Sequence, residues 1–564
     1  MNKYVMLLEI GRKQKYIFSS NKLAENIGAS IIIRNATERD AQAIYRKNEA
    51  ADQPQVIYEG GGNCLYVFQS KEAGDQFARE YSRYIIGNYP GITLYLVGTE
   101  LGEKEDGPES VKDGITRCYK LLNEKKNSRE HTAEVIDFGN TVRCASTNLP
   151  ASPKKRIHIP EDLKKKTNFS AESLKKYETA GEEQDISFRD LLPEREDGMR
   201  WAFPHRLDDL GRSVDEKSYI AVVHIDGNRM GQKIAAFNKD VEQGVKPGQG
   251  DVKEKEKKET FPETLEEFDQ RYIRELGKLS REIREKYKEA FQETVQVLAN
   301  NMAELRESLD IVTEGNKEYL PIRPLIMAGD DICFVTDGRI GIDITRVFLE
   351  AIRKKEIQGM TMNACGGVAI VKAHFPFSRA YDLAEELCEN GKNAIGGENA
   401  PDASYLDWHI DQGELDEGLA AIRSNYQIGE KMFLNMRPYR VGDRPNLKGD
   451  NDEALYYHFT DAMQIIQDTP RSKVKGYRDI AHRGLQAGEY YLKSNKLDET
   501  GEKKKNSSKK AEVINETVGL HCTHWKSGEG GFAVMKDGTR RHMFYDAMEA
   551  MDVYIELEEN NGEV

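Results

Sequence analysis

Three aspartates have the residue type and the placement that divalent metal chemistry requires. Asp226 follows the apolar run 219–225, and Asp330 and Asp331 lie at the turn between two further apolar runs. Magnesium binds proteins through one or two carboxylates and fills its other positions with water and phosphate oxygens. Two such ions, about 3.5–4 Å apart, can activate an attacking hydroxyl and stabilise a leaving pyrophosphate. We therefore predict that these side chains hold two Mg²⁺ or Mn²⁺ ions against the phosphates of a nucleoside triphosphate.

Two glycines beside these carboxylates fit the same chemistry. Gly227 follows Asp226 and Gly329 precedes Asp330. Because glycine lacks a Cβ atom, each lets the backbone approach a triphosphate closely. The string Gly329-Asp330-Asp331 alone is also typical of a solvated turn. The strand that ends at Asp226, and the order of the elements around it, favour the metal site.

The carboxylates converge only if the first strand lies beside the two strands of the hairpin. The ferredoxin-like arrangement of strand, helix, hairpin, helix and strand provides this neighbourhood. Hydrophobic periodicity predicts that order in the second half of the chain. The expected elements are a strand over 219–225, a helix that includes Phe291, Val295, Leu298 and Met302, a hairpin of 322–327 and 332–336, a helix over 340–352, a strand over 362–371, a helix over 378–394 and a strand over 404–410.

The same order is predicted once before, near the N-terminus. Two copies of one topology indicate a duplicated domain. The predicted fold class is therefore α+β, with two ferredoxin-like βαββαβ domains packed as a pseudo-dimer. The expected elements of the first copy are a strand over 3–10, helices over 14–28 and 37–49, a hairpin of 56–58 and 64–68, a helix over 73–86 and a strand over 92–97.

The first copy lacks the carboxylates of the second. Its hairpin turn reads Gly60-Gly61-Gly62-Asn63, and its first strand carries Glu9 instead of an aspartate. We expect this copy to be catalytically silent. Its glycines could let backbone amides hold a second nucleotide, and holding both reactants can lower a barrier by about 7–11 kcal/mol. The alternative is that the first copy is only a packing partner.

These motifs resemble the second palm domain of the large subunit of type III CRISPR effector complexes, a family related to GGDEF-type cyclases and palm polymerases. The family's Gly-Gly-Asp-Asp hairpin matches Ala328-Gly329-Asp330-Asp331, and its first-strand aspartate matches Asp226. The segments 364–370 and 380–392 resemble the strand and helix that follow, and 405–409 resembles the closing strand. The similarity extends to 2–30 and, more weakly, to the C-terminal region, so it covers most of the chain.

The resemblance implies a function, and the sequence departs from the family's pattern at several positions. It implies that ATP molecules are joined through 3′–5′ bonds into cyclic oligoadenylates, which act as antiviral messengers. It also implies that Lys392 contacts phosphate, whereas an exposed cation stabilised by the helix dipole is the alternative. Asn228 is expected at the nucleotide site, where relatives often carry a second aspartate, so one metal would be held less tightly. The sequence has no His-Asp dipeptide for a nuclease domain, and Cys144 has no partner cysteines for a zinc element.

Composition restricts the class of protein. The chain has 564 residues and a net charge of -14, which argues against nonspecific coating of DNA. No apolar run approaches the length of a membrane span, so we expect a cytoplasmic protein without membrane contact. Seven cysteines without a CxxC pair are expected to be reduced thiols. A zinc site at His521, Cys522 and His524 is disfavoured because neighbouring residues rarely point at one metal.

Domain boundaries follow from these assignments. The first copy is expected over 1–120, an irregular polar connector over 121–215, the second copy over 216–415 with a charged insertion at 237–262, and a helical region over 416–564. The helical region is expected to include a helix over 474–492, followed by a flexible loop over 497–511. The basic stretch in the last region could contact RNA or another CRISPR-type effector subunit, or could be a solvated helix face. Its residues are Arg471, Lys473, Lys475 and Arg478.

Two other functions compete with oligonucleotide synthesis. A templated or primed polymerase would need a basic, aromatic-lined groove for its nucleic acid, and the acidity of the chain argues against one. A scaffold or sensor that binds nucleotide or RNA without turnover would not need three carboxylates together. The substitution at Asn228 nevertheless keeps this third function open.

Overall fold

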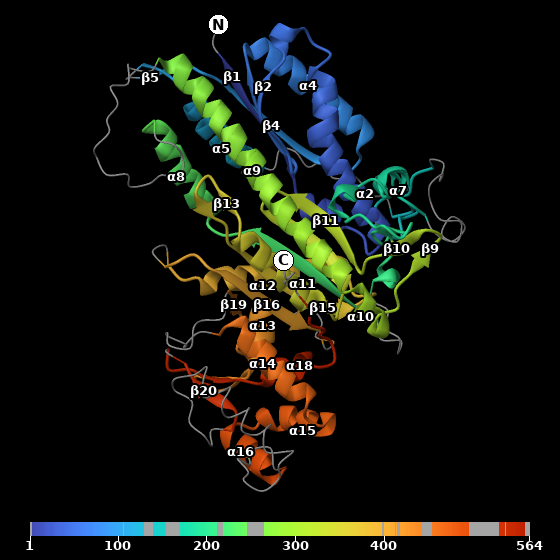
Figure 1. The fold of residues 1–564 in the computed structure, drawn as a ribbon. Coiled ribbons are helices and arrows are strands. Elements are labelled where there is room, and N and C mark those ends of the chain that lie inside the picture. Colours follow the sequence, from blue (N-terminus) through green and yellow to red (C-terminus); the bar gives the residue numbers. More distant parts are fainter. Residues whose placement is uncertain are drawn as a thin grey trace.

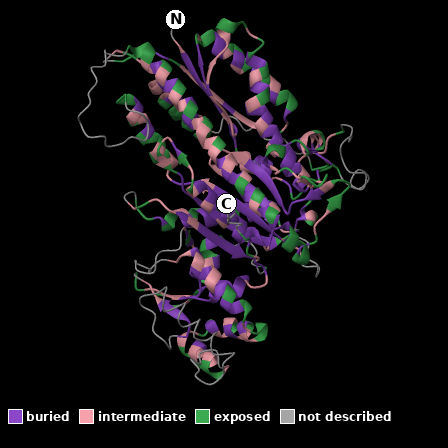
Figure 2. Cartoon of the chain, in the orientation of Figure 1, coloured by how far each residue is buried: buried purple, intermediate pink, exposed green. Residues whose placement is uncertain are grey.

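The computed structural model describes residues 3–104, 107–128, 139–153, 168–210, 218–244, 264–397, 400–411, 413, 418–442, 454–495, 530–535 and 537–558. The class is mixed α+β, with several sheets. The N-terminal sheet, the second sheet and the C-terminal region follow one another from top to bottom of Figure 1. Buried residues line the sheets and the inner helix faces (Figure 2). Within this part of the chain every helix is too short or too polar to span a bilayer.

The first sheet is antiparallel, with the strand order β2-β3-β1-β4. This order is the predicted one. The predicted helix over 14–28 is instead two helices, because the chain leaves helical geometry at Lys22, whose N–H donates to the Ser20 hydroxyl at 3.1 Å. The elements are β1 (Tyr4–Gly11), α1 (Lys13–Ile17), α2 (Leu23–Asn35), a π-helical turn (Ala36–Asp40), α3 (Ala41–Tyr45), β2 (Gln55–Gly60), β3 (Asn63–Phe68), α4 (Lys71–Asn88), β4 (Thr93–Glu100) and α5 (Val111–Asn127).

The second sheet repeats this order and then extends it. Its strands lie in the order β11-β12-β8-β15-β16-β19, and the first four are antiparallel neighbours as predicted. β16 adds parallel to β15, and β19 adds an edge strand that we did not predict. The strands are β8 (Tyr219–Gly227), β11 (Ile322–Ala328), β12 (Asp331–Asp337), β15 (Ala364–Lys372), β16 (Ser404–Ile410) and β19 (Tyr439–Val441).

Helices cover both faces of the second sheet. One face of β8 packs with α9 and α11, and the opposite face packs with α12. α8 continues to Glu242 and buries Phe237 and Val241, so the start of the predicted charged insertion is helical. Residues 245–263 lie outside the described part of the chain. The helices are α8 (Met230–Glu242), α9 (Leu265–Asn300), α10 (Met302–Ser308), α11 (Gly341–Arg353) and α12 (Phe377–Ala394).

The long helix α9 connects the two sheets and crosses the front of the molecule in Figure 1. Near its start, Asp269 accepts a hydrogen bond from the Val111 N–H at 2.8 Å. Further along, Arg284 donates to the Glu59 carbonyl in the first hairpin at 3.0 Å. Its last turns pack Phe291 against Phe334 of β12 and Phe348 of α11. One helix therefore fixes the first hairpin relative to the second sheet.

The connector is more regular than predicted. α5 runs through the expected boundary at 120, and α7 (Ala171–Glu183) packs so closely on α2 that a Cβ on Gly28 would lie 1.9 Å from the Lys176 carbonyl. β7 (Arg200–Ala202) pairs in parallel with β10 (Lys317–Tyr319), and β10 also pairs with β9 (Thr313–Glu314). Short elements of two or three residues carry too little periodicity to be predicted from sequence.

The C-terminal region contains helices and also a small sheet. The predicted helix over 474–492 is broken at Gly484, whose φ of 88° is incompatible with a continuing α-helix. The small sheet has the order β17-β18-β21-β20 and was not predicted. The elements are α13 (Leu419–Ser424), β17 (Gln427–Gly429), β18 (Met432–Phe433), α14 (Tyr456–Gln467), α15 (Arg471–Ala481), α16 (Leu485–Ser494), β20 (Phe532–Val534), β21 (Arg540–His542) and α18 (Tyr545–Ala550). The expected flexible loop over 497–511 lies outside the described residues.

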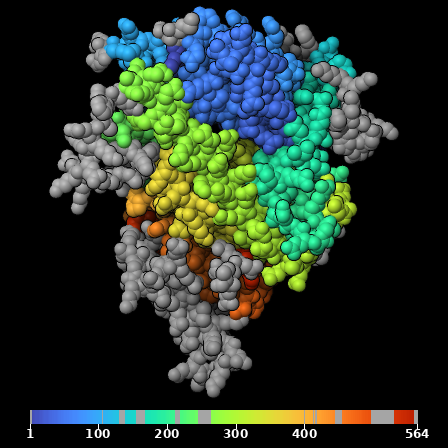
Figure 3. Space-filling model, turned by 45° about the horizontal axis from the view of Figure 1, so that its top comes forward, coloured from blue at the N-terminus to red at the C-terminus, as the bar shows by residue number. Residues whose placement is uncertain are grey.

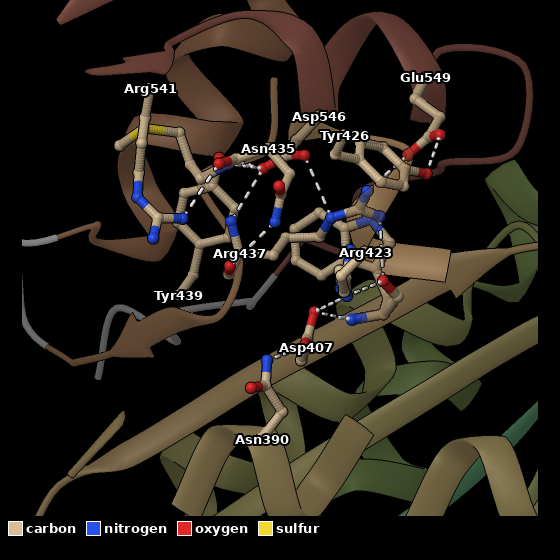
Figure 4. Close-up of polar contacts among 12 residues, drawn as sticks. Asn390, Asp407, Arg423, Tyr426, Asn435, Arg437, Tyr439, Arg541, Asp546 and Glu549 are labelled. Carbon is tan, nitrogen blue, oxygen red and sulfur yellow. Dashed lines mark hydrogen bonds and ion pairs between the residues drawn. The ribbon is translucent and has the colours of Figure 1, made fainter. Parts of the chain in front are cut away.

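Buried ion pairs join this region to the second sheet (Figure 4). Arg437 is 1% exposed and forms ion pairs with Asp546 at 3.1 Å and Glu549 at 2.7 Å, both on α18. The same guanidinium donates to the carbonyl of Trp408 in β16 at 2.9 Å. Next to it, the Asp407 carboxylate accepts hydrogen bonds from Asn390 of α12 and from Arg423. The network therefore links α18 to the sheet and to the helix that carries Lys392.

Candidate functional site

The structure brings the three predicted aspartates to one edge of the second sheet. β8 ends with Asp226-Gly227, and the hairpin pairs Ala328 with Asp331, which leaves Gly329 and Asp330 as a two-residue turn. Gly329 has a φ of 75°, which explains glycine at the first turn position. Because Ile225 of β8 pairs with Ile332 of β12, Asp226 and Asp331 end adjacent strands. Carboxylates from a strand end and a neighbouring turn thus face the same space.

Close packing holds Asp330 over Gly227. A Cβ atom on Gly227 would lie 2.8 Å from the Asp330 Cβ and 2.7 Å from the Tyr287 hydroxyl. The glycine is therefore required by the approach of Asp330, a reason that differs from the predicted approach of a triphosphate. Tyr287 comes from α9 and is fully buried, and its hydroxyl has no hydrogen-bond partner among the described residues. A polar atom without a partner thus lies beside the carboxylates.

The carboxylates repel one another in a poorly solvated place. Burial and the neighbouring Asp226 raise the pKa of Asp330 to about 6. Burial also raises the pKa of Asp331 to about 6, although the Lys13 ammonium opposes the shift. The Asp331 Oδ1 atom is buried and has no hydrogen-bond partner in the described structure. Such a group gains free energy when a cation approaches it.

Lys392 lies at this site and not on an exposed helix end. It stands in the last turn of α12, and its ammonium donates to the Asp226 carboxylate. Burial alone would lower the pKa of Lys392, but the adjacent Asp226 raises it above its ordinary value. His224, two residues before Asp226 on the same strand face, has its Nδ1 atom 3.8 Å from an Asp331 oxygen. The lysine is therefore placed to neutralise Asp226 or to contact a phosphate there.

The residues present fit a metal ion whose coordination is completed by phosphate oxygens and water molecules. Among the described residues, no group of three or more His, Cys, Asp and Glu side chains is assembled at metal-binding distances. Magnesium needs only one or two carboxylates when phosphate oxygens and waters supply the rest. The unpartnered Asp331 oxygen and the raised pKa of both hairpin aspartates show an excess of negative charge that such an ion would offset.

Asn228 is held by backbone contacts beside the end of β8. It is 1% exposed, and its side-chain amide donates to the Ala403 carbonyl at 2.8 Å. Its own N–H donates to the Asn363 carbonyl at 2.9 Å. These bonds tie the end of β8 to the residues that directly precede β15 and β16. The structure thus gives Asn228 a role in fixing the strand end, and its expected place at the nucleotide remains a prediction.

The first hairpin meets the second at its tip. Gly60, Gly61 and Gly62 all have positive φ values, so the turn itself requires glycine. A Cβ on Gly61 would lie 3.1 Å from the Ala328 Cβ. Lys13 donates to the Gly61 carbonyl at 2.7 Å, and the same ammonium opposes the rise in the pKa of Asp331. The two turns and Lys13 therefore surround one space, and contact of these glycines with a nucleotide stays a prediction.

A pocket opens at this contact between the two copies. It encloses about 490 Å³, including space open to solvent, and Lys13, Gly61, Ala328 and Asp331 are among its lining residues. Apolar side chains such as Ile33 line it as well. Apolar walls with a few convergent polar groups are typical of small-molecule sites. The pocket is therefore the space beside Asp331 into which a nucleotide could extend.

The first copy repeats the lysine–carboxylate pair without the hairpin aspartates. Glu9, near the end of β1, forms an ion pair with Lys126 of α5 at 2.6 Å. Lys126 lies in the last turn of its helix, as Lys392 does in α12. Arg12 and Arg229, each just before the helix that follows, share a left-handed φ of 53°. The two regions therefore share a lysine–carboxylate pair as well as the order of their elements.

Sequence reasoning missed four residues at the site: Lys13, His224, Tyr287 and Asp402. Burial raises the pKa of Tyr287, and Asp330, Asp226 and Asp402 add to the shift. Asp402 also forms an ion pair with Lys233 at 3.2 Å. For His224, the alternation of side chains along β8 was a usable signal, since it shares a face with Asp226. For Lys13, a usable signal was the equivalence of Glu9 and Asp226. Lys13 follows the strand that carries Glu9, so this equivalence places it near the corresponding edge of the first sheet. No sequence signal placed Tyr287 or Asp402.

Three other features of the sequence lie away from this site or outside the described residues. The basic stretch lies on α15, where Arg471 and Lys475 both pair with Asp552 and Lys473 donates to the Asn495 carbonyl. These contacts within the chain favour the solvated helix face over a nucleic-acid contact. His521, Cys522 and His524 lie outside the described residues. Cys144 is buried, and its thiol contacts Ser173 at 3.6 Å.

Residues 219–400 match the family model described as "Cas10/Cmr2, second palm domain". The match covers β8, the hairpin and α12, the elements that carry the three aspartates and Lys392. It confirms the resemblance predicted for this segment. No curated protein matches the chain.

Matches to solved structures were also found. They include an apo Csm1–Csm4 cassette, with 12% identity, a TM-score of 0.40 and coverage of 72% of this chain and 54% of that one. A Csm1–Csm4 cassette in complex with cA3 has 10% identity, a TM-score of 0.43 and coverage of 92% and 70%. Csm1 in T. onnurineus has 12% identity, a TM-score of 0.43 and coverage of 98% and 70%. The chain thus spans about half of the first of these solved chains.

Proposed function

Because residues 219–400 match the Cas10/Cmr2 second palm domain, we propose that the chain is a metal-dependent nucleotidyltransferase that makes cyclic or short linear oligonucleotides from ATP. The observation that carries the proposal is the meeting of Asp226, Asp330 and Asp331 at one sheet edge, where burial and mutual repulsion raise the pKa of both hairpin aspartates to about 6. The choice of ATP, and of the product as an antiviral signal, rests on the resemblance alone.

In the proposed mechanism, each role is assigned to a residue whose place in the structure is described above. Asp226, Asp330 and Asp331 would hold one or two Mg²⁺ or Mn²⁺ ions, which neutralise phosphate charge and lower the pKa of an attacking hydroxyl. Lys392, now paired with Asp226, would turn to the phosphates. The first copy would hold the second nucleotide beside Gly61 and Lys13, with the two domains packed as a pseudo-dimer. RNA or further effector subunits are proposed partners.

Product analysis separates this function from its two alternatives. The full chain is incubated with each nucleoside triphosphate and Mn²⁺ or Mg²⁺, first alone and then with a primed RNA template, and products are resolved by mass spectrometry. Short oligonucleotides from ATP without template support the proposal. Extension that occurs only on the template would identify a polymerase. Metal-dependent nucleotide binding without any product, with or without RNA, would identify a binding scaffold.

Metal binding should depend on pH around the shifted pKa values of the hairpin aspartates. A carboxylate must lose its proton to bind a metal ion, and a pKa raised to about 6 keeps Asp330 and Asp331 protonated at pH 5. We therefore expect Mn²⁺ affinity, measured by electron paramagnetic resonance, to be about 10- to 100-fold weaker at pH 5 than at pH 7.5. An affinity that is equal at the two pH values would show that these aspartates are not the ligands.

Replacing Lys392 by methionine should move two affinities in opposite directions. Without the ammonium, Asp226 is free, so Mn²⁺ should bind several-fold more tightly when no nucleotide is present. ATP affinity in saturating Mn²⁺ should fall about 10-fold, because a charge-assisted contact to phosphate is lost. Calorimetry measures both constants, and Lys354→Met, an exposed lysine that follows α11, is the matched control. If both affinities stay unchanged, Lys392 is only a helix-end cation.

A further inference from the structure

A second pocket lies outside the palm site, between the segment 184–205 and the strands β10 and β11. It encloses about 380 Å³, including space open to solvent, and we call it the Arg323 pocket. The segment belongs to the connector (teal in Figure 3), which covers a flank of the molecule beside β9 and β10. Four cations and one carboxylate, Asp185, are among the described residues that line it.

The innermost cation has no counter-ion. Arg323 is 1% exposed, and no carboxylate among the described residues lies within ion-pair distance of it. Its Nε atom has no hydrogen-bond partner in this part of the chain, and its closest polar contact is a long one of 3.5 Å to the Gln184 carbonyl. Burial, opposed by Asp185, lowers the pKa of Arg323 to about 9. The group is thus charged at neutral pH, and its burial is offset only by this long contact and by the face of the Phe203 ring, whose centroid lies 5.8 Å from the guanidinium carbon.

Two more cations face each other at the rim. Lys317 of β10 lies directly opposite Arg200 of β7 in the parallel pairing of these strands. Like charges in direct register destabilise a strand pair unless an anion separates them. The one carboxylate in the pocket, Asp185, already forms an ion pair with Lys317 at 2.8 Å and a hydrogen bond with the His205 ring at 3.1 Å. It therefore leaves Arg200 and Arg323 without neutralisation.

Neutral polar atoms without partners complete the lining. Ser187 is 2% exposed, and its hydroxyl has no hydrogen-bond partner in the described structure. The Nδ1 atom of His205 is also buried without a partner, while its Nε2 atom contacts Asp185. Burial and the nearby Arg323 lower the pKa of His205 to about 4, so its ring is neutral at pH 7. Buried polar atoms are rarely left unpaired unless a ligand or water satisfies them.

From these contacts we propose that the Arg323 pocket binds a phosphate group. The guanidinium of Arg323 offers a planar pair of donors for two phosphate oxygens, Arg200 and Lys317 add charge at the rim, and the Ser187 hydroxyl adds a neutral donor. The phosphate is either inorganic or carried by a nucleotide. The site is separate from the three aspartates, since it needs no metal ion and its lining residues include none of them.

The proposal is tested by titrating the full chain with inorganic phosphate, pyrophosphate or 5′-AMP in the presence of EDTA. Without divalent metal the palm aspartates repel phosphate, so binding reports on the Arg323 pocket. Arg323→Met should weaken binding at least about 10-fold, and Arg200→Met several-fold, because each loses a charge-assisted contact. Arg79→Met, an exposed arginine on α4, should leave affinity unchanged.

The probes also identify the source of the phosphate. Equal affinity for inorganic phosphate and 5′-AMP means that the site recognises the phosphate group alone. Tighter binding of 5′-AMP means that the site also contacts the nucleoside. Absence of binding by all three probes would overturn the proposal, as would binding that Arg323→Met and Arg200→Met leave unchanged. Because Arg200 is exposed, its variant keeps the test decisive if Arg323→Met does not fold.

Discussion

Replacing Asp330 and Asp331 together by asparagine is expected to lower product formation from ATP at least about 10³-fold. Asparagine keeps the shape of the hairpin turn but supplies neither the charge nor the second oxygen that a divalent ion needs. The same change removes two half-buried carboxylates whose pKa values are raised to about 6 by desolvation and by the neighbouring Asp226. Metal-free protein should therefore be as stable as the wild type or more stable.

Two measurements on the same preparation separate chemistry from folding. Product formation is followed by mass spectrometry, and the free energy of unfolding is followed in urea without metal. The matched control is Asp310→Asn, an exposed aspartate ahead of the same hairpin, which should change neither quantity. A double variant that retains activity would exclude the hairpin from catalysis. If the variant loses stability together with activity, the aspartates have a structural role.

Replacing Arg437 by methionine is expected to destabilise the C-terminal region by about 3–5 kcal/mol. The substitution leaves Asp546 and Glu549 buried without their shared cation, and burial raises the pKa of Asp546 even in the presence of the arginine. It also removes the guanidinium that stacks on Trp408 at 5.2 Å. Native-state hydrogen exchange in α14 and α18, followed by mass spectrometry, measures the local free energy of opening.

An exposed ion pair provides the control for this prediction. Arg471→Met breaks a pair with Asp552 in which the arginine side chain is 71% exposed, and it should cost at most about 1 kcal/mol. Adding Asp546→Asn and Glu549→Gln to Arg437→Met should restore part of the loss, because the uncompensated charges are then absent. If Arg437→Met and Arg471→Met had equal effects, the buried network would not hold the C-terminal region to the sheet.

The part of the site that sequence could predict is local to strands and turns. Asp226 ends a strand with continuous apolar character, and Asp330 and Asp331 lie between two more such strands, so a known strand order places all three at one edge. The fold of the second copy follows from the same periodicity. Lys392 was reached only through the resemblance, and the structure gives it a definite partner in Asp226.

The part that sequence could not predict depends on packing between distant segments. Tyr287 reaches Asp330 only because α9 runs beneath the hairpin, and nothing in the residues of that helix indicates it. Lys13 faces Asp331 because two turns from different copies touch at Gly61 and Ala328. Arg437, Asp546 and Glu549 assemble from segments about a hundred residues apart, as do the cations of the Arg323 pocket. From sequence alone, charged residues in such segments cannot be distinguished from those of a solvent-exposed surface.

The central claim is that Asp226, Asp330 and Asp331 together hold divalent metal against nucleotide phosphates. A crystal of the full chain grown with Mn²⁺ and a non-hydrolysable ATP analogue tests it directly, since the anomalous signal of manganese locates the ions. We predict manganese bounded by these three carboxylates and by phosphate oxygens. Nucleotide bound with manganese elsewhere, or with Lys392 still paired to Asp226 and no ion at the hairpin, would contradict the account.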